Sequence, residues 1–320
     1  MGSEATRSKI AARATSCWQE TRLPVDPADA AKAHAIICSF LDEEYAALPE
    51  KERVGKGAVF LCRPAATSLA AYFREQAPGK EIQPAQVIAF AEALYNVPDT
   101  RPRPFGKYIA IFFMAEFAKQ SIDWFAACEP LVISWATSTE WEIREMALEP
   151  LLHAVQKYPG FIIQRCQAWL RSPDENIRRF VAEGLRPRIG TKWLRDPAKN
   201  APVLDILGEL RHDPAEYVRK SVGNNLKDLS KYMPGVVLDL ADTWIRDEGI
   251  RVTPDLASRS KADIGAGAFA LVWILKQGLR WLNERNPELH GRIAAILGDD
   301  YVRYFDEKKN RGARPMASDD

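Results

Sequence analysis

The sequence has few residues of the kinds that bind metals or form disulfides, and those it has are not grouped. Five cysteines are scattered along the 320 residues without a C-x-x-C pair. An odd number of cysteines argues against a disulfide framework and favours a reducing compartment such as the cytoplasm. The four histidines lie far apart and show no metal-ligand spacing with cysteine or carboxylate. We therefore expect no metal site and no cofactor.

The sequence also lacks an excess of charge and a long apolar run. Its net charge is +1, so any basic surface must be local. No apolar stretch approaches the length of a transmembrane helix, and the N-terminus lacks the apolar centre of a signal peptide, so no membrane partner is expected. A hydrophobic content of 47% is ordinary for a globular protein with a full core.

Motifs of the common nucleotide-binding and hydrolytic folds are missing as well. There is no Gly-rich phosphate loop and no G-x-S-x-G nucleophile motif. GAGAF at 265–269 precedes a helical pattern, but no strand pattern comes before it, so a dinucleotide-binding interpretation fails. No segment from 105 to 300 alternates as a strand would, which predicts an all-α fold.

A repeated helix start is the most distinctive feature that is present. Ser172 and Asp213 are each followed by proline and, three positions after the first residue, by glutamate. A side-chain oxygen, a proline at the first helical position and an acid in the first turn together predict that a helix starts here. A third copy begins at Ser138. Each copy has an arginine six positions after its first residue: Arg144, Arg178 and Arg219.

The period of the repeat follows from bulky apolar residues that lie three positions before each helix start. Asp247 resembles the first residue of these starts, and a bulky apolar residue lies three positions before it as well. These residues are Trp135, Trp169, Leu210 and Trp244, at spacings of 34, 41 and 34. Helix pairs of this period form α-solenoids that bury their apolar faces by stacking. The tetratricopeptide pattern W-x-x-L-G-x-x-Y is absent, so the repeats are predicted to be HEAT-like, with the tryptophans in the core.

Composition divides the chain into four parts. Residues 1–25 are small and polar, which predicts a flexible N-terminus, and residues 26–100 form an N-terminal helical region. The alternating prolines of RPRPFGK, at 101–107, predict a rigid turn between this region and a HEAT-like domain over 105–300. The polar residues 306–320 predict a flexible tail.

The second helices of the repeats carry polar residues beside their buried stripe. In the copy that begins at Asp213 the predicted buried stripe is Val218, Val222, Leu226 and Leu229. The neighbouring stripe holds Asn224 and, one turn on, Asp228. Alignment on the repeated arginines places Glu149 and Glu183 level with Asn224. Because second helices usually line the concave surface of a solenoid, we expect these carboxylates on one concave, locally basic wall.

Cations surround these carboxylates in the sequence. Residues 171–231 contain 13 Lys or Arg against 9 Asp or Glu, which suits a polyanion that carries a cationic centre. Two structural interpretations stay open. Arg179 and Glu183 are an ordinary i,i+4 pair for a solvated helix, and the repeated arginines could form a ladder between repeats. Trp141 differs from the core tryptophans because it falls in the first turn of a second helix, where an exposed indole could stack on a base or sugar.

Four segments carry a resemblance to a known family. STEWEIRE, NIRRFVAEGLRPRIG, DPAEYVRKSVGNNLKDLSK and WILKQGLRWLNERNPE resemble the AlkC and AlkD family of DNA alkylation repair glycosylases, the AlkC branch more closely. The resemblance covers roughly residues 107–298. It implies an all-α HEAT-like solenoid that removes cationic N3- or N7-alkylated purines from double-stranded DNA by metal-free, cofactor-free hydrolysis of the N-glycosidic bond.

The resemblance also implies roles for residues. Carboxylates would stabilise the oxocarbenium-like sugar and position water, with Asp228 first and Glu183 and Glu149 next. Trp141 and Tyr217 would contact the sugar or the lesion. The residues expected to contact phosphates are Arg178, Arg179, Arg186, Arg188, Arg219, Lys220 and Lys227. The protein would act as a cytoplasmic monomer associated with the nucleoid.

Two other functions stay open at this point. The chain could be a non-catalytic HEAT-repeat protein that binds distorted or branched DNA, which keeps the cations but does not need Asp228. It could also be a HEAT-repeat adaptor that binds a protein through its concave face. A steep loss of DNA affinity with salt is required by the first two functions and not by the adaptor.

Overall fold

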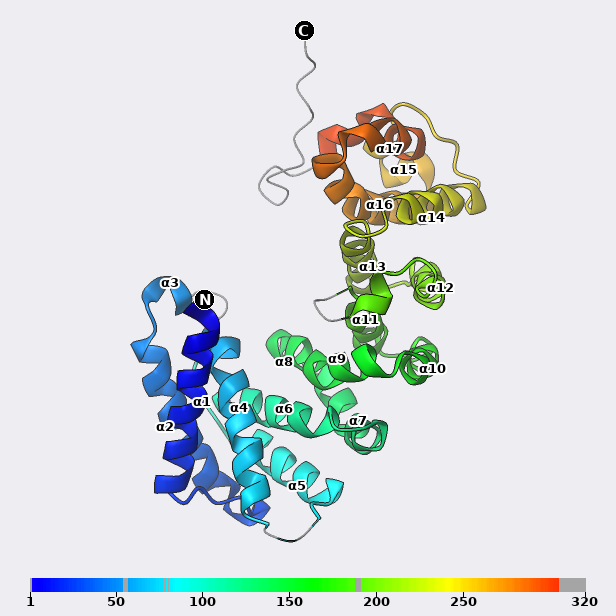
Figure 1. The fold of residues 1–320 in the computed structure, drawn as a ribbon. Coiled ribbons are helices and arrows are strands. Elements are labelled where there is room, and N and C mark those ends of the chain that lie inside the picture. The colour runs from blue at the N-terminus through cyan, green and yellow to red at the C-terminus, as the bar shows by residue number, and fades with distance from the viewer. Residues whose placement is uncertain (1, 54–56, 78, 80, 188–190, 305–320) are drawn as a thin grey trace. The chain divides into compact units, whose positions relative to one another are not determined.

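The structure is a computed structural model that describes residues 2–53, 57–77, 79, 81–187 and 191–304. These residues form helices and connecting loops, with no strand among them, so the predicted all-α class is confirmed (Figure 1). The chain divides into two compact units, Met1–Lys157 and Tyr158–Asp320. No helix in the described ranges is long and apolar enough to cross a membrane.

The first unit is built around a cluster of aromatic rings. Its helices are α1 (Gly2–Glu20), α2 (Ala30–Ala47), α3 (Glu50–Arg53), α4 (Gly57–Glu75), α5 (Pro84–Tyr95), α6 (Phe105–Ala118), α7 (Ile122–Ala136), α8 (Trp141–Met146) and α9 (Leu148–Lys157), with the 3-10 helix η1 (Pro27–Asp29). Phe73 of α4, Phe90 of α5 and Phe113 and Phe117 of α6 are buried, with ring centroids 5.1–5.9 Å apart. Such edge-to-face and tilted pairs join the three helices into one core.

The N-terminus differs from the sequence prediction of a flexible segment over residues 1–25. It forms the helix α1, which packs against α4. Ile10, Ala14 and Trp18 are buried on one side of this helix, four positions apart. A spacing of four places residues on one helix face, so three apolar residues are enough to anchor a segment whose overall composition is small and polar. The predicted flexible tail, 306–320, lies outside the described residues.

The division between the two units also differs from the predicted one at 101–107. The Arg103 guanidinium lies 3.7 Å from the Tyr45 ring centroid, and α6, which starts at Phe105, packs against α4 and α5. The proline-rich segment is therefore a turn inside the first unit. The aromatic face of α6 explains the difference, because it completes the core of the N-terminal helices.

The second unit is a stack of helix pairs. Its helices are α10 (Pro159–Trp169), α11 (Glu175–Gly184), α12 (Ala201–Leu210), α13 (Glu216–Leu229), α14 (Pro234–Asp247), α15 (Lys261–Ile264), α16 (Ala266–Arg285) and α17 (His290–Leu297), with 3-10 helices η2 (Lys192–Arg195), η3 (Leu256–Ser258), η4 (Pro287–Leu289) and η5 (Asp299–Tyr304). α10 packs on α12 in one row, and α11, α13 and α16 pack in succession in the other (Figure 1). The predicted core residues are buried: Trp135, Trp169, Trp244, Val218, Val222, Leu226 and Leu229.

The repeated helix starts lie slightly further along the chain than predicted. The helices begin at Trp141, Glu175 and Glu216, three residues after the predicted caps. The predicted caps instead form turns. The Ser172 hydroxyl and the Asp213 carboxylate each accept a hydrogen bond from the backbone N–H two residues on, at 3.2 and 2.9 Å. Short oxygen side chains favour such turns as well as caps, so the sequence pattern alone cannot separate the two.

The repeated arginines close these turns. Arg144, Arg178 and Arg219 each donate from Nη1 to the carbonyl oxygen six residues earlier, at 2.7, 2.8 and 2.5 Å, and to the next carbonyl, at 3.1, 3.0 and 2.8 Å. Arg178 also donates to both carboxylate oxygens of Asp213, at 2.5 and 3.0 Å. This contact joins one repeat to the next. It supports the ladder interpretation of Arg178.

Two glycines let α13 and α16 approach closely. A Cβ added at Gly278 would lie 2.8 Å from Cβ of Leu226, and one added at Gly223 would lie 2.8 Å from Cβ of Gln277. We expect Gly278→Ala to lower the free energy of unfolding by about 1–3 kcal/mol, because the helices would have to separate. Gly267→Ala, in the same helix with nothing within 4 Å, is the control. It should be stabilising by about 0.4–1 kcal/mol. Urea unfolding measures both, and equal stability of the two variants would contradict the close contact.

Candidate active site

Two carboxylates from neighbouring helices meet at one arginine. Glu183 lies near the end of α11, and Asp228 near the end of α13. Arg186, just after α11, donates from Nη1 to Glu183 at 2.8 Å, and from Nε and Nη2 to one Asp228 oxygen at 2.9 and 2.5 Å. Asn225 holds the two helices in register, because its side-chain amide donates to the Ala182 carbonyl at 2.9 Å. Two of the three predicted carboxylates are therefore brought together.

Both carboxylates are held in the ionised form. The side chains of Glu183 and Asp228 are 4% and 15% exposed. Burial alone would raise the pKa of Asp228, but the charge of Arg186 and hydrogen bonds from Lys231 and Arg186 lower it to about 2. For Glu183, burial is likewise outweighed by Arg186, so its pKa is also lowered. The site thus holds two anions at neutral pH.

Lysines of α13 and the residues just after it complete the surroundings of Asp228. The Lys231 ammonium lies 2.9 Å from Asp228 Oδ1, and the Lys227 ammonium 3.4 Å from the same oxygen. Burial and the charges of Arg280 and other cations lower the pKa of Lys227, although Asp228 opposes this shift. Three basic side chains therefore surround one carboxylate. The mixture of acids and cations predicted from the sequence is present.

α16 contributes residues that the sequence analysis did not single out. Arg280 donates to Asn224 Oδ1 at 3.3 Å and to Gln277 Oε1 at 2.6 Å. The Lys231 ammonium lies 4.8 Å from the centroid of the Trp281 ring, so one lysine joins Asp228 to this indole. Arg280 and Trp281 lie within a segment that carries the family resemblance. What places them here is the glycine contact between α13 and α16.

Arg179 and Tyr217 also lie beside the carboxylates. The Arg179 guanidinium is 4.4 Å from the centroid of the Tyr217 ring, and its charge helps to lower the pKa of Glu183. Arg179 and Glu183 are 6% and 3% exposed, so they are not the solvated surface pair considered above. Because Arg179 has so little exposed surface, it lies inside the site, where a DNA phosphate has little access to it.

The other predicted cations differ in their surroundings. Arg178 and Arg219 are held by the turns, so their first role is structural, whereas Lys220 is exposed on α13. Arg186 binds the two carboxylates, where a phosphate contact was expected. Arg188 lies outside the described residues. Phosphate binding by these side chains stays a prediction.

The remaining predicted site residues lie in the first unit. Trp141, at the start of α8, is 61% exposed, as the sequence predicted. Glu149 lies in α9 and pairs with Arg63 at 2.7 Å. α8 and α9 are separate because Pro150 lacks an N–H and its ring would clash with a carbonyl one turn earlier. The alignment of Glu149 with Glu183 and Asp228 stays a prediction.

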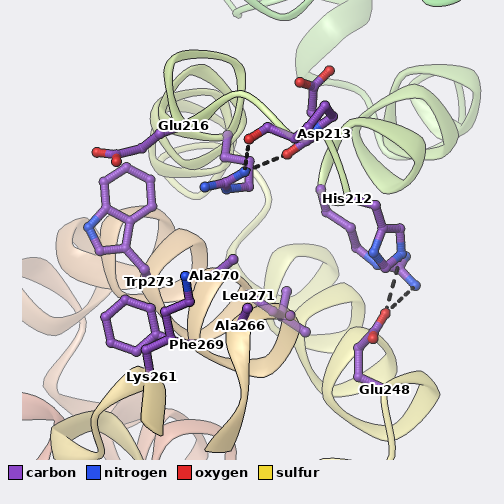
Figure 2. A pocket seen from close by; sticks show the side chains of 14 residues that line it. His212, Asp213, Glu216, Glu248, Lys261, Ala266, Phe269, Ala270, Leu271 and Trp273 are labelled. Atoms are coloured by element: carbon purple, nitrogen blue, oxygen red, sulfur yellow. Dashed lines mark hydrogen bonds and ion pairs between the residues drawn. The ribbon is translucent and has the colours of Figure 1, made fainter.

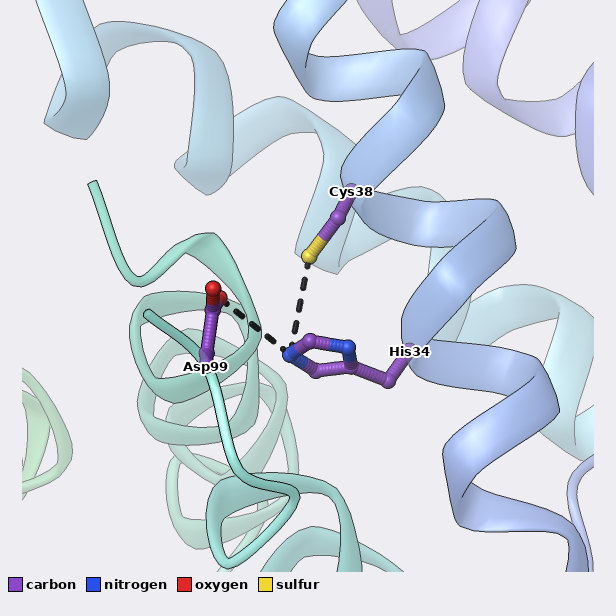
Figure 3. Close-up of side chains that lie close together, drawn as sticks. All are labelled: His34, Cys38 and Asp99. Atoms are coloured by element: carbon purple, nitrogen blue, oxygen red, sulfur yellow. Dashed lines mark hydrogen bonds and ion pairs between the residues drawn. The ribbon is translucent and has the colours of Figure 1, made fainter. Parts of the chain in front are cut away.

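A second cluster of polar side chains lies in the first unit (Figure 3). His34 and Cys38 are one turn apart on α2, and Asp99 follows α5. The distance from His34 Nε2 to Asp99 Oδ2 is 3.4 Å and to Cys38 Sγ is 3.7 Å. Arg101 donates to both Asp99 oxygens at 2.8 Å. Its guanidinium already neutralises this carboxylate and would repel a metal cation, so the cluster serves to fasten the loop after α5 to α2.

Comparison with known proteins decides the family. The sequence model of a family described as "DNA alkylation repair enzyme" matches residues 63–243. The chain belongs to the DNA alkylation repair enzyme family. The predicted family is thereby confirmed, and the match includes Glu149, Glu183 and Asp228. It begins earlier than the resemblance at 107–298 and ends before α16.

Three individual proteins of known sequence or structure resemble parts of this DNA alkylation repair enzyme. The uncharacterized protein YhaZ of Bacillus subtilis (strain 168) is 35% identical over 159 residues, 48% of this chain and 42% of YhaZ. Among solved structures, Pseudomonas fluorescens alkylpurine DNA glycosylase AlkC, bound to DNA containing an abasic site analog, has a TM-score of 0.49 at 19% identity, over 84% of this chain and 66% of AlkC. Streptococcus mutans AlkD2 has a TM-score of 0.48 at 17% identity, over 77% of this chain and 96% of AlkD2. The chain thus spans less than half the length of YhaZ and about two thirds of that of AlkC.

Proposed function

We propose that the protein is a DNA glycosylase that hydrolyses the N-glycosidic bond of cationic N3- or N7-alkylated purines in double-stranded DNA. The observation that supports this most is the pair of ionised carboxylates, Glu183 and Asp228, held on neighbouring helices by Arg186. Membership of the DNA alkylation repair enzyme family supplies the kind of substrate.

The protonation state of the site suits a cationic leaving base. An ordinary purine leaves with difficulty unless an acid protonates it, and a carboxyl with a pKa of about 2 is no proton donor at neutral pH. An alkylated purine already carries the positive charge and takes the electron pair of the breaking bond without a proton. The barrier that remains is the positive charge that develops on the sugar. Asp228 is the group we assign to stabilising it.

The other residues of the site have supporting roles in this proposal. Water attacks the sugar carbon as the bond to the base breaks, and the base takes the bonding electron pair and leaves neutral. A carboxylate accepts a hydrogen bond from that water, whose proton passes to solvent as the sugar hydroxyl forms. Glu183 and Glu149 are the candidates for this contact. Tyr217 and Trp141 would contact the sugar or the base. Lys220 and Lys227, which were predicted to contact phosphates, and Lys231, which was not, would bind phosphates flanking the lesion.

The proposed activity needs no metal and no cofactor, because the charge is supplied by the substrate and by side chains. It requires access to chromosomal DNA, and we therefore place the protein in the cytoplasm, associated with the nucleoid. We expect one copy of the chain to be sufficient for the reaction.

Release of methylated purines from N-methylated duplex DNA tests the proposal. We expect the wild-type protein to release them above the no-enzyme background, at a rate that is the same from pH 5 to pH 8. Asp228 has a folded-state pKa of about 2 and stays ionised over this whole range. A rate that falls as the pH rises through about 6 would instead indicate a general acid, contrary to the proposed mechanism.

Parallel measurement of DNA binding separates the alternatives. Binding that weakens steeply with salt, without base release, would favour a non-catalytic DNA-binding protein. Absence of both DNA binding and base release would favour the third function, a HEAT-repeat adaptor that binds a protein. Either outcome would overturn the glycosylase.

A further inference from the structure

A cavity of about 670 Å³ lies beside the first turns of α13 and α16. It is separate from Glu183 and Asp228, which do not line it. Figure 2 shows residues from α13, α15 and α16 around the opening, with the loop before α13 and the end of α14 closing it. Its volume is in the range of sites that hold a small organic molecule.

The charges of the lining do not cancel locally. Asp213 is engaged by Arg178, and Glu248 by His212 at 3.3 Å and Arg211 at 3.7 Å. Two further cations, Arg219 and Lys261, line the cavity without a carboxylate within ion-pair distance in the part of the chain that the structure describes.

The Arg219 guanidinium is only partly used. Its Nη1 donates to the Asp213 and Pro214 carbonyl oxygens, which carry no full negative charge, and its Nε is buried without a hydrogen-bond partner in the described residues. Glu216 is exposed at the edge of the cavity, beside Trp273 (Figure 2). Lys261 is likewise exposed, so the partly used guanidinium of Arg219 is the group that favours an anion in the cavity.

Aromatic side chains form one wall beside these cations. Phe269 and Trp273 lie one turn apart on α16, both are partly exposed, and Lys261 lies next to them (Figure 2). An indole that is not fully buried offers a stacking surface for a planar ring, worth about 1–3 kcal/mol per nucleobase. Gly267, in the same wall, has no atom within 4 Å of the position of a Cβ, so the space in front of it is open.

We propose that this cavity binds a nucleotide, with its phosphate at Arg219 and Lys261 and its base against Phe269 and Trp273. Neither the cations nor the aromatic rings alone would select this ligand. Together they match a planar ring joined to a phosphate. The nucleotide could be free or could be one unit of a DNA strand, and only the second source rests on the proposed function.

Titration with deoxyadenosine monophosphate, followed by calorimetry, tests the site. We expect binding by the wild-type protein and a loss of at least about tenfold in Gly267→Leu, whose side chain fills the open space without displacing a neighbour. Gly291→Leu is a matched control, because Gly291 is also exposed, at the second position of α17, with nothing within 4 Å. Lys261→Gln should weaken nucleotide binding about tenfold and leave deoxyadenosine binding unchanged.

Binding of unmodified duplex DNA to the same variants identifies the source. If the site holds a strand, deoxyadenosine monophosphate displaces the duplex and Gly267→Leu weakens duplex binding. If it holds a free nucleotide, duplex binding is unchanged while nucleotide binding is lost.

Three results would overturn the proposal: no nucleotide binding by the wild type, equal binding by Gly267→Leu, or inorganic phosphate binding as tightly as the nucleotide. None of these depends on base release. The nucleotide site and the glycosylase can therefore fail separately.

Discussion

Asp228→Asn is expected to reduce the single-turnover rate of base release by about two to three orders of magnitude. The substitution keeps the shape of the side chain and removes the negative charge that faces the developing positive charge on the sugar. DNA binding should persist or become tighter, because Arg186, Lys227 and Lys231 would then be less neutralised. Rates from N-methylated duplex DNA and affinities for the same duplex provide the two measurements.

A second carboxylate serves as the control. Asp205 is exposed on α12, does not line the cavity and does not contact Glu183 or Asp228. Asp205→Asn changes the net charge by the same amount as Asp228→Asn. It should leave both rate and affinity unchanged. If Asp228→Asn released bases at the wild-type rate, the assignment of Asp228 would be incorrect, and Glu183 or Glu149 would become the carboxylate to test.

Arg186→Met is expected to destabilise the protein by about 3 kcal/mol. Glu183 is 4% exposed, and removal of Arg186 leaves its charge without its closest hydrogen-bonded cation. Breaking a buried ion pair costs more than the pair contributes, because the remaining charge is still shielded from water. The free energy of unfolding, from urea titration at neutral pH, measures the effect.

Two further results test the cause. Arg186→Met combined with Glu183→Gln should recover most of the lost stability, because the buried charge is then absent. The difference between wild type and Arg186→Met should also shrink as the pH falls from 5 toward 2. The folded-state pKa values of Asp228 and Glu183 are lowered, so the stability they contribute is present above the unfolded pKa of about 4 and lost below it. A constant difference across this range would point to lost packing instead.

Much of the second unit could be predicted because its signals are local. The apolar stripe ending at Leu229 and the tryptophans before each turn follow from helical periodicity and from the repeat length. Glu183 and Asp228 were placed on one wall by aligning equivalent positions, which works where helices stack in register. The starts of the helices were misplaced by two residues, because a serine or aspartate that forms a turn has the same sequence signature as one that caps a helix.

What could not be predicted depends on contacts between distant segments. Arg280 joins the site only because Gly278 lets α16 pack tightly on α13, and a glycine in a helix carries no sign of what it contacts. Arg186 looked like one more phosphate-binding cation, since its two carboxylate partners come from different helices. The N-terminal helix was overlooked because Ile10, Ala14 and Trp18 are few among many polar residues.

The contact between Arg178 and Asp213 has a consequence for how the repeats tolerate changes in length. It joins two turns directly, across the segment that lengthens the spacing from Trp169 to Leu210 to 41 residues. The relative placement of α11 and α13 is therefore fixed by this contact and by the Asn225 hydrogen bond to Ala182, and not by the length of the connection. We therefore expect insertions or deletions between α11 and α12 to leave the placement of Glu183 relative to Asp228 unchanged.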